Sequence, residues 1–307
     1  MQPTIAILMC TLNGERFLDE QLRSIHSQTY QNWKLYVSDD SSSDDTISII
    51  HNFAARYPNG KVTLFKGPSQ GFANNFMSLA INPEIRADLY FFSDQDDIWL
   101  PEKLQAAIDY LYLSKMDMPA LYGARTLLGR IDGSIYGLSP LFQYPKIFRN
   151  ALVQCVAGGN TMAFNHATKL IIEEVGVVDI VSHDWWFYIF VTGIGGKFFY
   201  DETPNIIYRQ HPQSVIGANT SMLNKLSRIK YVLSGRYRKW SEINTTALIK
   251  IRHLLTEEHL EDLDYFIAAR QAASVKDRIR LLNIAGVYRQ NRKGTFALFL
   301  AILLNKI

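Results

Sequence analysis

Apolar, strand-like runs alternate with helical stretches in the first third of the sequence, and this alternation restricts the fold more than any other feature. The apolar runs cover residues 5–11, 33–40, 61–67 and 88–94. The helical stretches between them cover residues 13–28, 41–57 and 71–81. Such an order predicts βα units around a mostly parallel sheet, which is an α/β fold.

Polar residues follow three of these runs where the predicted strands end, in residues 11–13, 39–43 and 93–97. In open α/β sheets, ligands bind outside the carboxyl ends of the strands. We therefore expect the three polar segments to line one crevice.

The stretch FFSDQDDIWL, residues 91–100, contains three aspartates, Asp94, Asp96 and Asp97. They can cap the helix that we expect from about Pro101, or lie on a solvated loop. Capping needs only one carboxylate, however, and three repel one another unless a positive charge lies among them. Acids at positions i and i+2 can bind a hard divalent cation, which offsets the negative charge on a departing diphosphate. The surplus acids therefore favour a cation site.

The sequence contains neither the GxGxxG nor the GxxxxGK[ST] motif. The sequence therefore does not favour a dinucleotide-dependent oxidoreductase or a phosphate-loop kinase. Asp39 and Asp40 follow the second strand, where an acid can accept hydrogen bonds from a nucleoside. A nucleotidyltransferase also uses paired acids, but it is expected to have a glycine-rich basic loop, which this sequence lacks.

The middle of the chain has short strand candidates at residues 121–128, 158–165, 195–202 and 205–211. After Gly217 the pattern changes to long helical stretches. We place a boundary near residue 220, which predicts a catalytic domain over 1–219 and a helical extension over 220–307. The two cysteines, Cys10 and Cys155, and the lack of a signal-peptide pattern indicate a reducing, intracellular environment.

The helical extension is basic, with 16 Lys and Arg against 7 Asp and Glu from Leu223 to Ile307. Residues 225–239 have a basic amphipathic pattern suited to an anionic membrane surface, and a solvated basic face is the alternative. No nucleic-acid motif accompanies the charge. The run FALFLAILL, residues 296–304, is too short to cross a bilayer, so it either docks on the catalytic domain or lies at the membrane interface.

The segments ILMCTLNGERFLDEQLRSIHSQTYQNWKLYVSDDSSSDDT and FFSDQDDIWLPEKL resemble the inverting nucleotide-sugar glycosyltransferases of family two, which have an A-type fold. The motif SDQDDIW, residues 93–99, most resembles the corresponding sequence in bacterial rhamnosyltransferases of surface polysaccharide synthesis. The resemblance covers about residues 3–217 and implies an A-type glycosyltransferase fold, a Rossmann-like mixed sheet, followed by the helical extension.

The resemblance also implies roles for single residues around the donor. Asp94-Gln95-Asp96 matches the D-x-D motif of the family, in which Asp96 would bind the metal, Mn²⁺ or Mg²⁺, and Asp94 would lie toward the ribose. The other implied donor contacts are Thr11, Asn13, Glu15, Asp40 with Asp39 beside it, and Arg209 toward phosphate. His211 would be a further metal ligand.

The segment SHDWWFYIF, residues 182–190, corresponds to the acceptor side of the family. Asp184 would be the general base, with capping of the next helix as the alternative. His183 replaces the usual Glu before it. His183, Trp185 and Trp186 are candidate acceptor contacts, although tryptophans in an apolar helix more often belong to the core.

The sequence thus predicts a metal-dependent inverting glycosyltransferase at the cytoplasmic face of the cell membrane. Its implied substrates are a nucleotide-sugar donor and a saccharide or lipid-linked saccharide acceptor. The donor that the resemblance favours is dTDP-L-rhamnose. Two alternatives stay open: the same fold with a UDP-hexose donor, and a non-catalytic sugar-nucleotide-binding or scaffold protein. Self-association is also left open.

Overall fold

A seven-stranded sheet forms the centre of the molecule, for which a computed structural model describes residues 2–112, 117–211 and 235–304. The strand order is β10-β6-β9-β4-β1-β2-β3. The strands are β1 (Ile5–Thr11), β2 (Trp33–Asp39), β3 (Val62–Lys66), β4 (Leu89–Ser93), β6 (Ala120–Ala124), β9 (Ala163–Asn165) and β10 (Lys197–Asp201). β9 runs antiparallel to β4 and β6, and the other neighbouring strands are parallel. The predicted mixed α/β sheet is confirmed.

Helices cover both faces of this sheet, so its central strands are apolar on both sides. In β1, Ile7 and Met9 join one buried cluster, whereas Leu8 and Cys10 join the other. The first cluster is covered by α1 (Leu18–His26), α2 (Thr46–Ala54) and α4 (Lys103–Leu111). The second is covered by α3 (Phe72–Ala80), α5 (Phe148–Ala151), α6 (His166–Val175) and α7 (His183–Gly193). These two layers fix where each strand ends and its loop begins.

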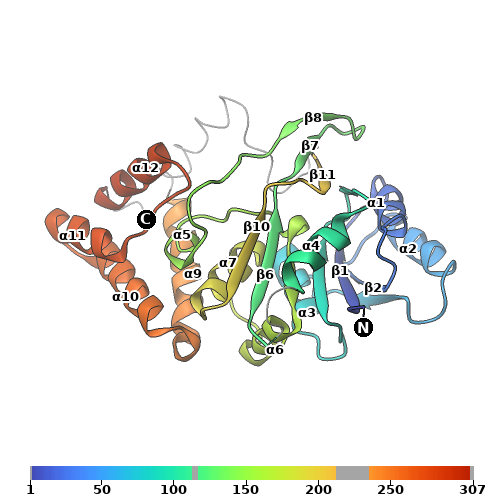
Figure 1. Cartoon of the computed structure of the whole chain (residues 1–307), viewed down its shortest axis with the longest axis horizontal. Coiled ribbons are helices and arrows are strands. Elements are labelled where there is room, and N and C mark those ends of the chain that lie inside the picture. The colour runs from blue at the N-terminus through green and yellow to red at the C-terminus, as the bar shows by residue number, and fades with distance from the viewer. Residues whose placement is uncertain (1, 113–116, 212–234, 305–307) are drawn as a thin grey trace.

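A smaller sheet lies at one end of the large sheet, above β6 and β10 in Figure 1. Its order is β5-β11-β7-β8, with β5 (Ile98–Trp99), β7 (Leu127–Gly129), β8 (Ile135–Leu138) and β11 (Ile206–Arg209). The predicted single strand over 121–128 is therefore split between two sheets, because β6 pairs with β10 and β7 pairs with β11. The small sheet carries β5 and β11, which both adjoin residues 94–97.

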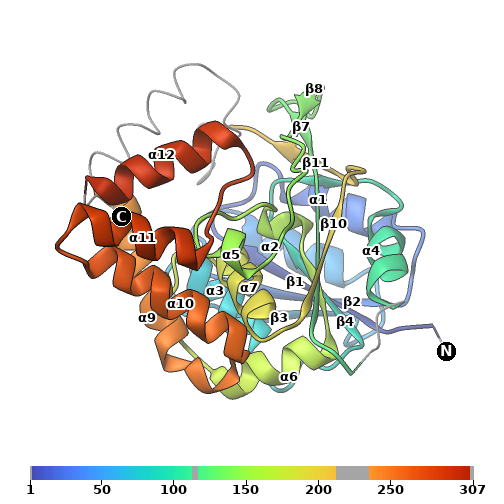
Figure 2. The same ribbon diagram turned by 60° about the vertical axis from the view of Figure 1, so that its left-hand side comes forward.

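The C-terminal part is helical, as predicted, and it lies against one side of the sheet domain (Figures 1 and 2). Its helices are α9 (Arg236–Lys250), α10 (Glu257–Gln271), α11 (Val275–Ala285) and α12 (Arg292–Leu303). Gly286 adopts a left-handed conformation with φ of 62° and ends α11. The boundary predicted near residue 220, and Lys225, Arg228 and Lys230 of the amphipathic stretch, lie outside the described residues.

The helix α12 packs one of its faces into the core. Leu298, Ala301 and Ile302 are buried, whereas Phe296 is 72% and Leu300 47% exposed. The run over 296–304 therefore docks on the core and still presents a second apolar face. None of the described helices has both the length and the apolar character needed to span a membrane.

The C-terminal helices share the buried cluster of α3, α6 and α7, so we expect both parts to unfold together. Phe266 in α10 is fully buried in that cluster. Phe266→Ala should lower the free energy of unfolding by about 3–5 kcal/mol, because it leaves a cavity in a shared core. Urea unfolding followed by tryptophan fluorescence measures this. Tyr265→Ala, next to it but 37% exposed, is the control, and two separate transitions would contradict a shared core.

Candidate active site

The carboxyl ends of β1 and β2 carry the first group of predicted donor-site residues. Thr11 and Asp39 are register partners, and Oγ1 of Thr11 donates to Oδ1 of Asp39 at 2.8 Å. Asn13 has a left-handed backbone, with φ of 48°, and its Oδ1 accepts from the backbone N–H of Ser43 at 2.9 Å. The loops after the two strands are therefore joined through their side chains.

Glu15 and Asp40 extend this group and also bind backbone N–H groups. Oε2 of Glu15 accepts from the N–H of Asp45 at 3.1 Å. The Asp40 carboxylate accepts from the N–H groups of Ser69 at 2.6 Å and Gly71 at 3.1 Å, and the residue is 8% exposed. Asp40 thus orders the loop between β3 and α3. The structure brings these predicted residues into one region at the edge of the sheet.

The acidic loop, residues 94–97, joins β4 to β5 and lies beside the end of β1. One ligand atom from each of Asp94, Asp96 and Asp97 can be chosen so that all three lie within 4.8 Å of one another. Gln95 holds the loop in place: its Oε1 accepts from the N–H of Leu12, and its Nε2 donates to the carbonyl of Leu12, both at 2.9 Å. The D-x-D segment is thereby fixed to the first strand.

The electrostatics of the acidic loop are unfavourable to three ionised carboxylates. Burial raises the pKa of Asp94 well above its usual range, and the charges of Asp97, Asp96 and Asp184 raise it further. Burial and Asp96 raise the pKa of Asp97 to about 8, against hydrogen bonds from Asn160 and the N–H of Arg209. The site therefore either takes up protons or binds a cation.

The end of β11 packs onto the acidic loop through two predicted residues. Nε2 of His211 lies 2.7 Å from Oδ2 of Asp96, and its ring stacks on Phe17 at 5.0 Å between centroids. Arg209 is 2% exposed and donates from Nε to the carbonyl of Asp96 at 3.0 Å. Its other guanidinium nitrogens donate to the carbonyl of Ile131 at 2.6 Å and to the carboxylate of Glu20. In this structure Arg209, predicted toward phosphate, is engaged by protein oxygens.

Asp184 lies in the first turn of α7, whose N-cap residue is Ser182. It is half-buried, and its Oδ1 accepts from the N–H of Trp185 at 2.7 Å. The charge of Asp184 contributes to the raised pKa of Asp94, after burial and the charges of Asp97 and Asp96. Because Ser182 holds the N-cap position, Asp184 is not the cap of its helix.

The neighbours of Asp184 are buried. His183 is 4% exposed, its ring stacks on Phe76 at 4.0 Å, and burial lowers its pKa to about 4, so it is neutral. Trp185 donates from Nε1 to the carbonyl of Ala151 at 2.7 Å, and Trp186 is fully buried. Both tryptophans pack in the core because α7 is covered on all sides, which leaves no exposed ring for stacking on an acceptor sugar.

Two buried residues that the sequence analysis did not single out adjoin the acidic loop. Lys103 is 1% and Asn160 3% exposed, and Nδ2 of Asn160 donates to Oδ2 of Asp97 at 2.6 Å. Lys103 stands at the start of an amphipathic helix, where a lysine is usually a solvated residue. The sequence analysis predicted a strand over residues 158–165, which contain Asn160, but it did not predict the contact of Asn160 with Asp97.

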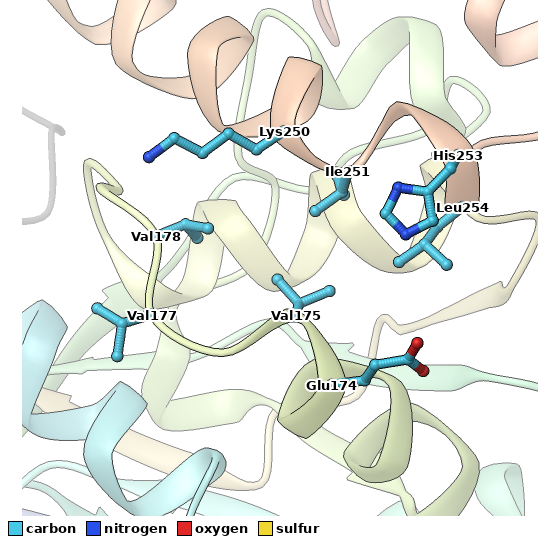
Figure 3. A pocket seen from close by; sticks show the side chains of 8 residues that line it. All are labelled: Glu174, Val175, Val177, Val178, Lys250, Ile251, His253 and Leu254. Atoms are coloured by element: carbon cyan, nitrogen blue, oxygen red, sulfur yellow. The ribbon is translucent and has the colours of Figure 1, made fainter.

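A pocket of about 230 Å³ lies elsewhere, between the end of α6 and the end of α9 (Figure 3). It is lined by Glu174, Val175, Val177, Val178, Lys250, Ile251, His253 and Leu254. None of these residues belongs to the acidic loop or to the other predicted site positions. The pocket is therefore a separate feature of the junction with the C-terminal helices.

Comparison with known proteins gives the family. The sequence model described as Glycosyl transferase family 2 matches residues 6–121. The dTDP-rhamnosyl transferase RfbG of Shigella flexneri is 30% identical over 242 residues, which are 75% of this chain and 81% of that protein. The chain is also 28% identical to the UDP-Glc:alpha-D-GlcNAc-diphosphoundecaprenol beta-1,3-glucosyltransferase WfgD of Escherichia coli, over 50% of this chain and 58% of that one.

Solved structures show the same fold at low sequence identity. TarS 1-349 of S. aureus in complex with UDP-GlcNAc has a TM-score of 0.57 at 12% identity, over 91% of this chain and 79% of that chain. The mannosyltransferase PcManGT of Pyrobaculum calidifontis, in complex with GDP-Man and Mn²⁺, has a TM-score of 0.51 at 15% identity, over 100% of this chain and 86% of that one. The sheet domain with its acidic loop is thus the A-type fold of nucleotide-sugar glycosyltransferases. The chain belongs to glycosyltransferase family 2.

The contacts of Arg209 predict a structural cost for a change that keeps its charge. Arg209→Lys should lower the free energy of unfolding by about 1–3 kcal/mol, because a single ammonium group cannot reach the acceptors that the guanidinium now joins. Urea unfolding is the measurement. Arg130→Lys, at an exposed arginine of the adjacent turn, is the control, and equal stability of both variants would contradict this role.

Proposed function

We propose that this glycosyltransferase is metal-dependent and inverts the configuration of the transferred sugar. The observation that carries the proposal is the crowding of three carboxyl groups in the acidic loop, with His211 in contact with Asp96. These acids require a positive charge among them, and the charge of Asp184 adds to the effect on Asp94.

The donor set fits a divalent cation. Carboxylate oxygens suit Mg²⁺ and Mn²⁺, and a neutral imidazole suits Mn²⁺. Asp96 and His211 would hold the ion, Asp94 would lie toward the ribose, and Asp97 is fully buried and faces Asn160. A bound ion would offset the negative charge that develops on the departing diphosphate. Mn²⁺ accompanies GDP-Man in PcManGT, which has the same fold.

Asp184 would act as the general base. A carboxylate at this position removes the proton from an acceptor hydroxyl while the diphosphate leaves from the opposite face of the sugar, and this in-line geometry inverts the anomeric carbon. The charge of Asp184 favours the departure of that proton only while the acid is ionised. Its half-buried position leaves it open to an acceptor.

The nucleoside would bind across the ends of β1 and β2, with Thr11, Asn13, Glu15, Asp39 and Asp40 as its lining. Most of these side chains now bind one another or loop backbone, so their role would be to shape the loops as well as to contact the nucleotide. Arg209 would hold the acidic loop in position. Its contact with the carbonyl of Asp96 supports that role.

We propose dTDP-L-rhamnose as the donor, on the strength of the likeness to RfbG, and a growing surface polysaccharide or lipid-linked saccharide as the acceptor. The alternative donor is a UDP-hexose, since WfgD is named for UDP-Glc and TarS was solved with UDP-GlcNAc.

A screen of sugar nucleotides with Mn²⁺ or Mg²⁺, following release of the nucleoside diphosphate, tests this function. We expect release with dTDP-L-rhamnose, loss of release with a chelator, and loss of metal stimulation in Asp96→Asn. Asp184→Asn should lower turnover by about 10²–10⁴-fold, the range for removal of a general base, and still bind Mn²⁺.

Asp109→Asn, at an exposed acid of α4, is the matched control and should keep full activity. Release that is unaffected by chelator would contradict metal dependence. If no donor is bound or turned over, and if Asp96→Asn and Asp184→Asn leave function intact, the protein is a non-catalytic binding or scaffold protein.

We also propose that the enzyme works on an anionic membrane surface, at the inner face of the cell membrane, with α12 as a contact. Phe296, Leu300 and Leu304 are 72%, 47% and 55% exposed and recur every four residues along one side of the helix. Arg292 and Lys293 are exposed at its start. An apolar stripe next to basic residues suits the headgroup region of anionic lipid.

Co-sedimentation with phosphatidylglycerol-containing vesicles tests the membrane proposal. The double variant Phe296→Glu/Leu300→Glu should bind these vesicles about tenfold more weakly, because it places two charges in the apolar stripe. Val177→Glu, at a residue that is 75% exposed in the pocket region of Figure 3, should bind like the wild type. Binding that ignores the double variant, or a dimer in light scattering that the variant dissociates, would contradict a lipid partner.

A further inference from the structure

A buried lysine and a buried asparagine lie under the acidic loop. Nζ of Lys103 donates to the backbone carbonyl of Asn160 at 2.9 Å, and it lies 4.9 Å from the centre of the Trp99 ring. Nδ2 of Asn160 donates to Oδ2 of Asp97 at 2.6 Å. Lys103 is thereby joined to the acidic loop through Asn160, and its charge also lowers the pKa values of Asp94 and Asp97.

Asp97 is the anchor of this group, not a substrate contact. It is fully buried, and both carboxylate oxygens are engaged, Oδ2 by Asn160 and Oδ1 by the N–H of Arg209 at 3.2 Å. A buried carboxylate with these donors and a nearby ammonium holds its neighbours in fixed positions. Asp96, the next residue along the chain, therefore has little freedom to move.

The same group reaches the proposed base from the other side, through Gly159. A Cβ atom on Gly159 would lie 2.0 Å from Nε2 of His183, so this glycine and the imidazole are in close contact. The imidazole cannot swing away, because it stacks on Phe76 and meets the edge of Phe92 at 4.8 Å between centroids. His183 directly precedes Asp184.

The acidic loop and Asp184 are thus connected by one chain of buried contacts. It runs from Asp97 to Asn160, through the backbone to Gly159, and across a close packing contact to His183. Neither ring nitrogen of His183 has a hydrogen-bond partner among the described residues, so shape and not hydrogen bonding holds the ring. Rigid packing of this kind transmits displacements, because a close-packed interior has no space to absorb them.

We propose that Lys103, Asn160 and Gly159 are positioning residues that set the location of Asp184 relative to the acidic loop. This inference rests on the proposed function, since it assigns these residues to the distance between the metal site and the base. Lys103 holds the backbone carbonyl of Asn160, Asn160 holds the carboxylate of Asp97, and Gly159 allows the close approach of His183.

The chain offers a matched comparison for Lys103. Lys169 in α6 is also fully buried, and its Nζ donates to the carbonyl of Asn82 at 2.9 Å and pairs with Glu173. Burial lowers the pKa of both lysines to about 7. Among the described contacts, none joins Lys169 to the acidic loop or to residues 158–160. Loss of either lysine should cost stability, but only Lys103 should affect the reaction.

The experiment compares Lys103→Met, Asn160→Ala and Lys169→Met below their unfolding temperatures. Mn²⁺ binding is measured by electron paramagnetic resonance, nucleoside diphosphate binding by calorimetry, and turnover by donor hydrolysis with the sugar nucleotide that the wild type accepts. In Lys103→Met and Asn160→Ala we expect kcat to fall about 100-fold, because the base is misplaced, while Mn²⁺ and nucleotide affinities stay within about threefold. Lys169→Met should lower the melting temperature and keep kcat within about twofold of the wild type.

Gly159→Ala provides a second, independent probe, because it pushes on His183 without removing a charge or a hydrogen bond. We expect the same loss of kcat at unchanged Mn²⁺ affinity. Gly137→Ala, where the added Cβ makes only an ordinary contact of 3.9 Å with Leu128, should behave like the wild type.

Three results would overturn the inference. The first is wild-type kcat in Asn160→Ala or Gly159→Ala, the second is equal loss of kcat in Lys103→Met and Lys169→Met, and the third is a parallel loss of metal binding and turnover. Absence of donor turnover by the wild-type protein would instead contradict the proposed function itself, so the two failures are distinguishable.

Discussion

Electrostatic repulsion in the acidic loop is the constraint on which the surrounding structure depends. Three carboxyl groups follow β4 within four residues, and burial makes their ionisation costly. The side-chain amide of Asn160 and a backbone N–H from β11 donate to the Asp97 carboxylate, and the buried Lys103 lies nearby. The small sheet contributes as well, because Arg209 and His211 at the end of β11 both contact Asp96 of the loop. The end of β11 therefore helps to hold the acidic loop in place.

The sequence was sufficient for the parallel half of the sheet and for the strand ends that carry polar residues. β1 and β4 are buried on both faces, so their runs are continuous, and the boundaries of β1, β2 and β4 agree with the predictions to within about one residue. The middle of the chain was harder, because its elements are short. β6 and β7 were predicted as one strand over 121–128, but they are separated at Arg125 and Thr126 and pair with different strands. β8 was missed because Ile135 and Leu138 are exposed and give no burial signal.

The candidate site divides in a similar way. Clustered polar residues at strand ends, such as Asp39, Asp94 and Asp96, are visible in sequence because polarity is unusual there. Lys103 is not, because a lysine at the start of a helix normally reaches solvent, and only the fold shows that this one points inward. The tryptophans after Asp184 illustrate the converse: α7 is apolar on every side because it is enclosed, and its rings belong to the core.

Topology explains how residues far apart in sequence come to share one site. β9 runs antiparallel between β4 and β6, and Phe91 of β4 pairs with Ala163. The residues just before β9 therefore lie beside the residues just after β4, which brings Asn160 to Asp97. A parallel strand in the place of β9 would carry residues 158–160 to the opposite edge of the sheet, away from the acidic loop. The antiparallel direction of β9 thus allows residues 158–160 to contact the acidic loop on one side and α7, which carries Asp184, on the other.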